Sequence, residues 1–62
     1  MNNASLLGRP HFELIERNGY QETVIGRYAT EEEAANMRDS RLVIYESRHL
    51  SHGVLMVRGR EL

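Results

Sequence analysis

Residues 26–39 read GRYATEEEAANMRD, a basic and aromatic segment that changes abruptly into three glutamates followed by alanines. Thr30 followed three residues later by Glu33 matches a capping box. In that motif the threonine oxygen accepts from the Glu33 N–H while the Glu33 carboxylate reaches back to the Thr30 N–H. Glu31 and Glu32 would occupy the first turn, where the positive end of the helix dipole favours negative charge. The stretch therefore predicts the start of a helix and explains all three glutamates without a catalytic or metal-binding role.

We expect this helix to run from Glu31 to about Ser40, because Asp39 and Ser40 interrupt its periodicity. A helix of that length is not stable alone in water, so it must lie on a sheet. Ala34 and Met37 share one stripe, and small alanines allow a close approach between helix and sheet.

Upstream of the helix, residues 11–28 alternate in polarity and predict two strands joined at Asn18-Gly19, a dipeptide typical of hairpin turns. A two-residue turn would pair Arg17 with Tyr20. A three-residue loop with a bulge at Gly19 would instead pair Phe12 with Val24.

The second register is favoured because a one-residue slip moves every side chain to the opposite face. It collects one set of apolar and aromatic residues on a single face: Phe12, Leu14, Tyr20, Val24 and Tyr28.

Downstream of the helix, residues 41–47 (RLVIYES) are rich in β-branched and aromatic side chains and predict a third strand. Residues 53–59 (GVLMVRG) are apolar at consecutive positions, which is typical of a strand covered on both faces. We expect this last strand to be central in the sheet or to be buried by a second copy of the protein.

These segments predict an α+β fold in β-β-α-β-β order, with one short helix on one face of a small antiparallel sheet. Residues 11–62 would form a single domain, and residues 1–10 a flexible N-terminal tail. A chain of 62 residues can bury only a small core, and the absence of cysteine excludes disulfides and thiolate zinc sites. Self-association, most simply a homodimer, is the expected additional source of stability.

The charge pattern limits the partners. The net charge is −1 with neutral histidines, and all eight basic residues are arginine. No apolar run approaches the roughly 18 residues of a membrane span, and the first ten residues do not resemble a signal peptide. The sequence thus predicts a cytoplasmic protein without membrane contact.

Residues suited to catalysis or to cofactor and metal binding are sparse. His49 and His52 form an H-x-x-H pair in a predicted loop with no third ligand in obvious reach. Ser51 beside His52 is not the arrangement that nucleophilic triads use, and no glycine-rich loop precedes the helix. We therefore expect no enzyme, no cofactor and no metal.

Nucleic-acid binding is the alternative function, because basic residues cluster in the last third of the chain and could form a strip beside Tyr45. Against it stand the nearly neutral total charge and the few aromatic residues available to stack on bases. The basic residues concerned are Arg41, Arg48, His49, His52, Arg58 and Arg60.

The sequence favours a non-catalytic protein-binding module, a small bacterial or phage regulator or inhibitor that covers a site on a partner protein. Arginine, tyrosine and methionine are enriched at protein interfaces. The hairpin followed by YATEEEA also resembles a unit found in small bacterial and phage domains, and this resemblance implies no activity. The expected anchor residues are Tyr20, Tyr45, Arg48, Met56 and Arg58.

Overall fold

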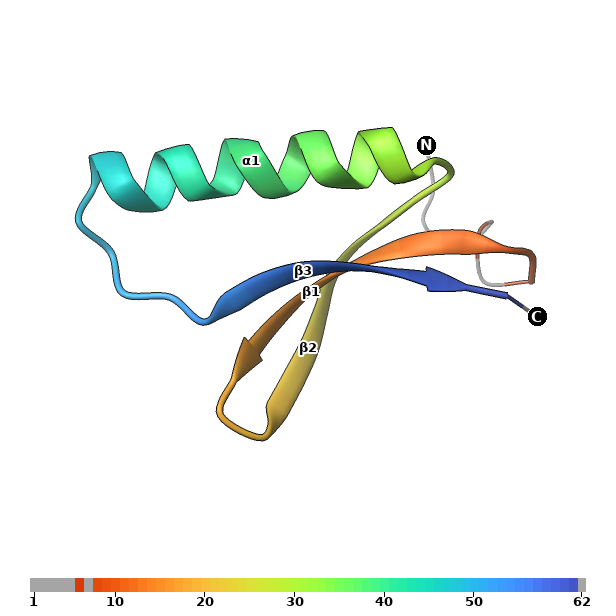
Figure 1. Cartoon of the computed structure of the whole chain (residues 1–62), viewed down its shortest axis with the longest axis horizontal. Coiled ribbons are helices and arrows are strands. Elements are labelled where there is room, and N and C mark those ends of the chain that lie inside the picture. The colour runs from red at the N-terminus through yellow and green to blue at the C-terminus, as the bar shows by residue number, and fades with distance from the viewer. Residues whose placement is uncertain (1–5, 7, 62) are drawn as a thin grey trace.

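The computed structural model describes residue 6 and residues 8–61. Its elements are β1 (His11–Asn18), β2 (Gln21–Tyr28), α1 (Glu31–Ser47) and β3 (Val54–Arg60). The strands form one antiparallel sheet in the order β2-β1-β3, and α1 lies along one side of it (Figure 1). The predicted α+β class is confirmed. The predicted β-β-α-β-β order is wrong, because the order among these residues is β-β-α-β.

The N-terminal cap of α1 forms as the sequence predicts, with one difference. The Glu33 N–H donates to Thr30 Oγ1 at 3.1 Å, and the helix begins at Glu31. The Glu33 carboxylate accepts from the Thr30 hydroxyl, with 3.2 Å between Oγ1 and Oε1, rather than from the Thr30 N–H. The three glutamates of the first turn therefore act in helix initiation.

The helix continues through residues 41–47, so the predicted strand in this segment is wrong. Ala34, Arg38, Leu42 and Tyr45 follow helical spacing and are the buried or half-buried positions of one stripe. In a strand, Leu42 and Tyr45 would lie on opposite faces, whereas in the helix both lie on the sheet side. No glycine or proline occurs between residues 31 and 47 to end the helix earlier.

The helix ends in a Schellman motif, which satisfies its last carbonyl groups. The His49 N–H donates to the Glu46 carbonyl at 3.2 Å, and the Leu50 N–H donates to the Tyr45 carbonyl at 2.9 Å. His49 has a φ of 53°, in the left-handed region that this position requires. Glycine usually fills that position, so the sequence lacks the usual stop signal.

The β1–β2 hairpin turns near the predicted place but in a different register. Asn18 pairs with Gln21, which leaves a two-residue turn of Gly19 and Tyr20. Gly19 has a φ of 62°, and Tyr20 has no positive φ, as in a type II′ turn with glycine at its first central position. The predicted three-residue loop with a bulge at Gly19 is therefore wrong.

The bulge lies in the middle of β2 instead. Leu14 pairs with Gly26 and Ile15 pairs with Val24, so Ile25 is the extra residue. Phe12 consequently pairs with Tyr28, and the predicted Phe12–Val24 pair is wrong. The bulge changes which face β2 residues occupy, so Val24 no longer lies on the same face as Tyr28.

Strand β3 confirms the strand predicted at residues 53–59, shifted by one residue. It pairs with β1, with Leu14 opposite Val57 and Ile15 opposite Met56. It is an edge strand of the described sheet, so its predicted central position is wrong. The other alternative, that a second copy of the protein buries this strand, stays a prediction.

The core is small. Among the described residues, its buried apolar members come from all parts of the fold except β2 and β3: Leu6, Leu14, Ile15 and Ala34. Several large apolar side chains are exposed at the same time: Tyr20, Val24, Met37, Val43, Ile44, Leu50 and Val54. The tail predicted at residues 1–10 includes residues 1–5 and 7, which lie outside the described residues.

None of the helices formed by residue 6 and residues 8–61 has the length and apolar character needed to cross a membrane.

Candidate functional site

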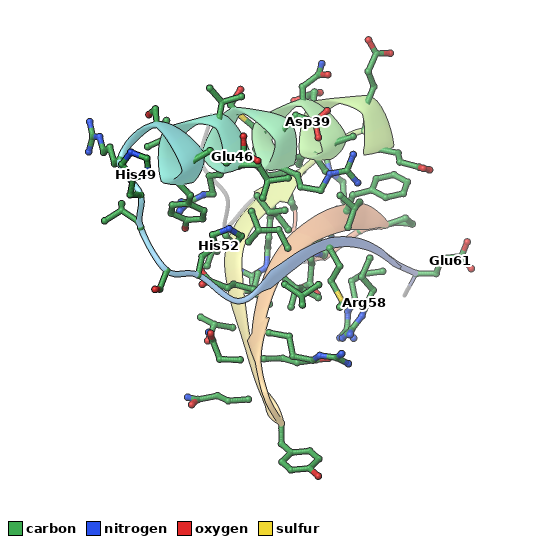
Figure 2. All side chains as sticks on the ribbon, turned by 60° about the vertical axis from the view of Figure 1, so that its left-hand side comes forward. Asp39, Glu46, His49, His52, Arg58 and Glu61 are labelled. Carbon is green, nitrogen blue, oxygen red and sulfur yellow. The ribbon has the colours of Figure 1, made fainter. Side chains whose placement is uncertain are left out.

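The side of the sheet turned away from α1 gathers most of the charged strand residues. We call it the open face, because no helix or strand of residues 8–61 lies over it. Figure 2 shows Arg58 on this side, and strand alternation with the observed registers places the others beside it. The open face comprises His11, Glu13, Ile15, Arg17, Glu22, Val24, Arg27, Val54, Met56, Arg58 and Arg60.

An apolar row crosses the middle of the open face. Val24, Ile15 and Met56 lie side by side on β2, β1 and β3. Ile15 is buried, Met56 is half-buried and Val24 is exposed. Val54, which is 56% exposed, extends the row along β3. The row gives the open face a hydrophobic centre bordered by charged residues at both ends.

An ion pair spans the sheet over this row. Arg58 on β3 lies opposite Glu13, and Glu22 on β2 lies opposite Arg17, so Ile15 sits between the two positions on β1. Arg58 Nη2 donates to both carboxylate oxygens of Glu22, at 3.0 and 3.1 Å. The pair must therefore pass across Ile15, and it helps to exclude water from that side chain.

A second charged group surrounds Glu13. The Glu13 carboxylate lies 3.5 Å from Arg27 Nε, 3.9 Å from Arg60 Nε and 3.7 Å from His11 Nε2. Its side chain is only 9% exposed. Two arginines thus share one largely buried carboxylate, which leaves positive charge unneutralised at this end of the face.

Some hydrogen-bonding capacity of this group is unused. His11 Nδ1 lies 2.8 Å from the Arg9 carbonyl, and because a carbonyl only accepts, Nδ1 carries the hydrogen. His11 Nε2 and Arg27 Nε are buried and have no hydrogen-bond partner in the described part of the chain. The contact of Arg27 Nε with Glu13 at 3.5 Å is therefore a charge contact without hydrogen-bond geometry.

The charges of the open face do not cancel. Arg17, Arg27, Arg58 and Arg60 supply four positive charges against two negative charges from Glu13 and Glu22, a surplus of two. Guanidinium groups match carboxylates in shape and charge and form strong paired hydrogen bonds with them. The arrangement suits binding of an acidic, partly apolar surface and contains no arranged nucleophile.

Two of the expected anchor residues, Met56 and Arg58, lie on the open face. Tyr20 lies in the β1–β2 turn and is fully exposed. Tyr20 therefore lies at the tip of the hairpin, outside the open face.

The other two expected anchors lie at the C-terminal end of α1. Tyr45 is half-buried and stacks on His52, with ring centroids 4.6 Å apart, and Arg41 Nη1 donates to its hydroxyl at 3.2 Å. Figure 2 shows His52 between the helix and the sheet. Arg48 is the exposed C-terminal cap residue of the helix. The structure does not bring these two residues together with Met56 and Arg58.

An open hollow of about 630 Å³ lies between the C-terminal half of α1 and the hairpin end of the sheet. At the edge of this hollow, the Glu16 carboxylate on β1 accepts from the Gly53 N–H at 2.9 Å and so holds the loop before β3 against β1. The lining residues are Arg17, Asn18, Gly19, Leu42, His52, Gly53, Val54 and Leu55.

The basic strip considered for nucleic-acid binding is divided in the structure. Arg41 contacts Tyr45 on the sheet side of the helix. His49 lies at the helix end, and Arg58 lies on the opposite side of the molecule (Figure 2). Among residue 6 and residues 8–61, no group of three or more histidines and carboxylates is arranged to hold a metal ion.

The cluster around Glu13 was missed by the sequence analysis, as were Arg17, Arg27 and Arg60 as members of one face. The available signal was the alternation of charged residues in HFELIER, which places His11, Glu13 and Arg17 on one side of a strand. The partners on β2 depend on the β1–β2 register, which differs from the predicted one in its turn and in the bulge at Ile25.

No protein-family model, no curated protein and no solved structure matches the chain.

Proposed function

We propose that this protein is a non-catalytic binding module that uses its open face to cover an acidic site on another protein, and thereby regulates or inhibits that protein. The observation that carries the proposal is the set of accessible apolar side chains, Val24, Met56 and Val54, that arginines border on the open face. Protein interfaces combine an apolar centre with a polar rim, and arginine is enriched in them. Arg58 and Met56 remain the central anchors.

The chemistry of the partner follows from the charge surplus. Arg27 and Arg60 share the single carboxylate of Glu13. A partner carboxylate placed beside them would complete the pairing, and opposite charge across an interface also accelerates association. Tyr20 at the hairpin tip can extend the contact beyond the sheet, whereas Tyr45 is engaged with His52 and Arg41.

Self-association is a second part of the proposal. Seven large apolar side chains are exposed among the described residues of a chain with a small core. A homodimer that covers some of them would add buried apolar area at about 25 cal/mol per Å². It would also be consistent with the marginal stability expected of a chain of this size.

The test of the binding surface is an NMR titration of the ¹⁵N-labelled protein with poly-glutamate at 50 and 200 mM salt. The expected result is that backbone signals of open-face residues shift, with signals of the outer helix face unchanged, and that the shifts weaken at the higher salt concentration. Arg60→Glu should abolish the shifts. Arg48→Glu, the same charge change at the helix end, should leave them intact.

Shifts centred on the C-terminal end of α1, or equal losses in the two variants, would reject the open face as the binding surface. A parallel titration with single-stranded and duplex DNA distinguishes nucleic-acid binding from protein binding. If DNA shifts the open-face signals at lower concentrations than poly-glutamate does, the face is a nucleic-acid surface and the protein-binding proposal is wrong.

A further inference from the structure

The outer edge of β3 is an unpaired row of backbone groups. β3 pairs with β1 on one side, and within the described residues no strand pairs with its other side. None of the turn, loop or cap hydrogen bonds of the described chain involves β3. The strand runs for seven residues, from Val54 to Arg60. An edge of this kind is a template for the addition of another strand.

β3 also lacks several of the features that usually protect an edge. Its sequence VLMVRGR contains no proline, no lysine and no acidic residue, and its pairing with β1 has no bulge. The opposite edge differs, because β2 is interrupted by the bulge at Ile25. Arg58 does not guard the β3 edge either, since its guanidinium points across the sheet to Glu22.

The apolar run of β3 points to a use for this edge. Leu55 and Val57 face the helix and are half-buried, whereas Val54 and Met56 lie on the open face. Edge strands in monomeric proteins are normally polar on their exposed side. An added strand would cover part of the apolar surface on both sides of β3.

Charge distinguishes between the possible occupants. A second copy of β3 would bring four arginines onto two adjacent strands without a carboxylate in either, so no pairing register would give these arginines an opposite charge. A strand with acidic residues at alternate positions would place its carboxylates beside Arg58 and Arg60 on the open face. The charges therefore favour an acidic extended segment over a second β3.

We propose that β3 accepts an extended acidic segment of a partner protein as an added strand, with alternate carboxylates of that segment lying beside Arg58 and Arg60. This inference rests on the proposed function and specifies its binding mode. Backbone hydrogen bonds would supply affinity, and the arginines would select the acidic side chains.

The test uses an acetylated and amidated heptapeptide in which valine and glutamate alternate, with binding to the full chain measured by isothermal titration. Two derivatives carry N-methyl groups, one on the valine amides and the other on the glutamate amides. Amides of consecutive residues point to opposite edges of a strand, and valine and glutamate alternate in this peptide, so one derivative loses its bonds to β3 and the other keeps them. We expect about a tenfold or larger loss of affinity for one derivative and little change for the other.

A peptide of the same composition with its valines and glutamates in two blocks is the charge-matched control, and it should bind more weakly than the alternating peptide. Arg60→Gln should weaken binding of the alternating peptide, and Arg48→Gln should leave that binding unchanged. Equal binding of the two methylated derivatives and of the block peptide would overturn strand addition while leaving acidic binding by the open face in place. If none of the peptides binds and poly-glutamate does not shift the open face, the proposed function fails together with the binding mode.

Discussion

Arg58 and Glu22 connect the two outer strands of the sheet across the central strand, with Nη2 of the arginine 3.0 Å from Oε1 of the glutamate. The two residues are separated by 36 positions in sequence. Their side chains are 42% and 38% exposed, so the charge interaction is partly screened by water. The pair also covers Ile15, and its effect on stability therefore combines ion pairing with the exclusion of water from an apolar side chain.

Neutralising either member of this pair should lower stability modestly. Arg58→Gln and Glu22→Gln should each reduce the free energy of unfolding by about 0.5–1 kcal/mol, with a coupling energy of about 0.5 kcal/mol in the double-mutant cycle. The measurement is urea unfolding at low and high salt, and the coupling should shrink at high salt. A coupling of zero at low salt would show that the pair does not form in solution.

Gly53 and Gly59 offer a matched pair of substitutions. A Cβ at Gly53 would collide with the Arg17 carbonyl oxygen, where the backbone cannot easily move, so Gly53→Ala should cost about 1–3 kcal/mol. A Cβ at Gly59 would meet Phe12 at an ordinary 3.5 Å, so Gly59→Ala should be neutral or slightly stabilising. Thermal unfolding measures both changes. Equal melting temperatures would mean that the close approach of Gly53 to β1 is absent.

The cap of α1 should contribute measurably to stability. Thr30→Ala removes the acceptor for the Glu33 N–H and should cost about 1 kcal/mol, which is about 4–8 °C in melting temperature for a domain of this size. Thr30→Ser keeps the hydroxyl and should restore most of the loss. Circular dichroism follows the helix during unfolding, and an unchanged transition in the alanine variant would show that the capping box is not needed.

Self-association should increase with protein concentration. Sedimentation equilibrium between about 5 and 500 μM should show the average mass rising from monomer toward dimer, because the exposed apolar side chains gain from mutual burial. Val43 is 65% exposed on the helix, so Val43→Glu tests whether the helix takes part in self-association. A protein that stays monomeric throughout and melts at high temperature would contradict the prediction.

The sequence was sufficient to locate the elements whose signals are local. The capping box identified the start of α1, Asn18-Gly19 identified the turn region, and the apolar run at residues 53–59 identified β3. Each of these depends on a few neighbouring residues and on chemistry that acts over short distances.

Features that depend on distant contacts could not be read from the sequence. Residues 41–47 have the composition of a strand, but the helix places Leu42 in the hollow beside Leu55 and stacks Tyr45 on His52, and neither neighbour is apparent from the segment alone. The helix ends at a left-handed residue that is His49 instead of the usual glycine, so the sequence carries no clear signal for the helix end. The bulge at Ile25 changes the β1–β2 register and therefore which β2 residue lies beside Glu13.

The attachment of α1 determines how the molecule opens. The helix has 17 residues, yet Ala34 is its one fully buried position, whereas β1 is hydrogen-bonded to a strand on each side. Backbone amides of α1 should therefore exchange with deuterium through local opening, well before those of β1, whose exchange requires loss of the sheet. The sheet then stays folded while α1 detaches from it by local unfolding. A ligand bound to the open face would remain in place during that opening.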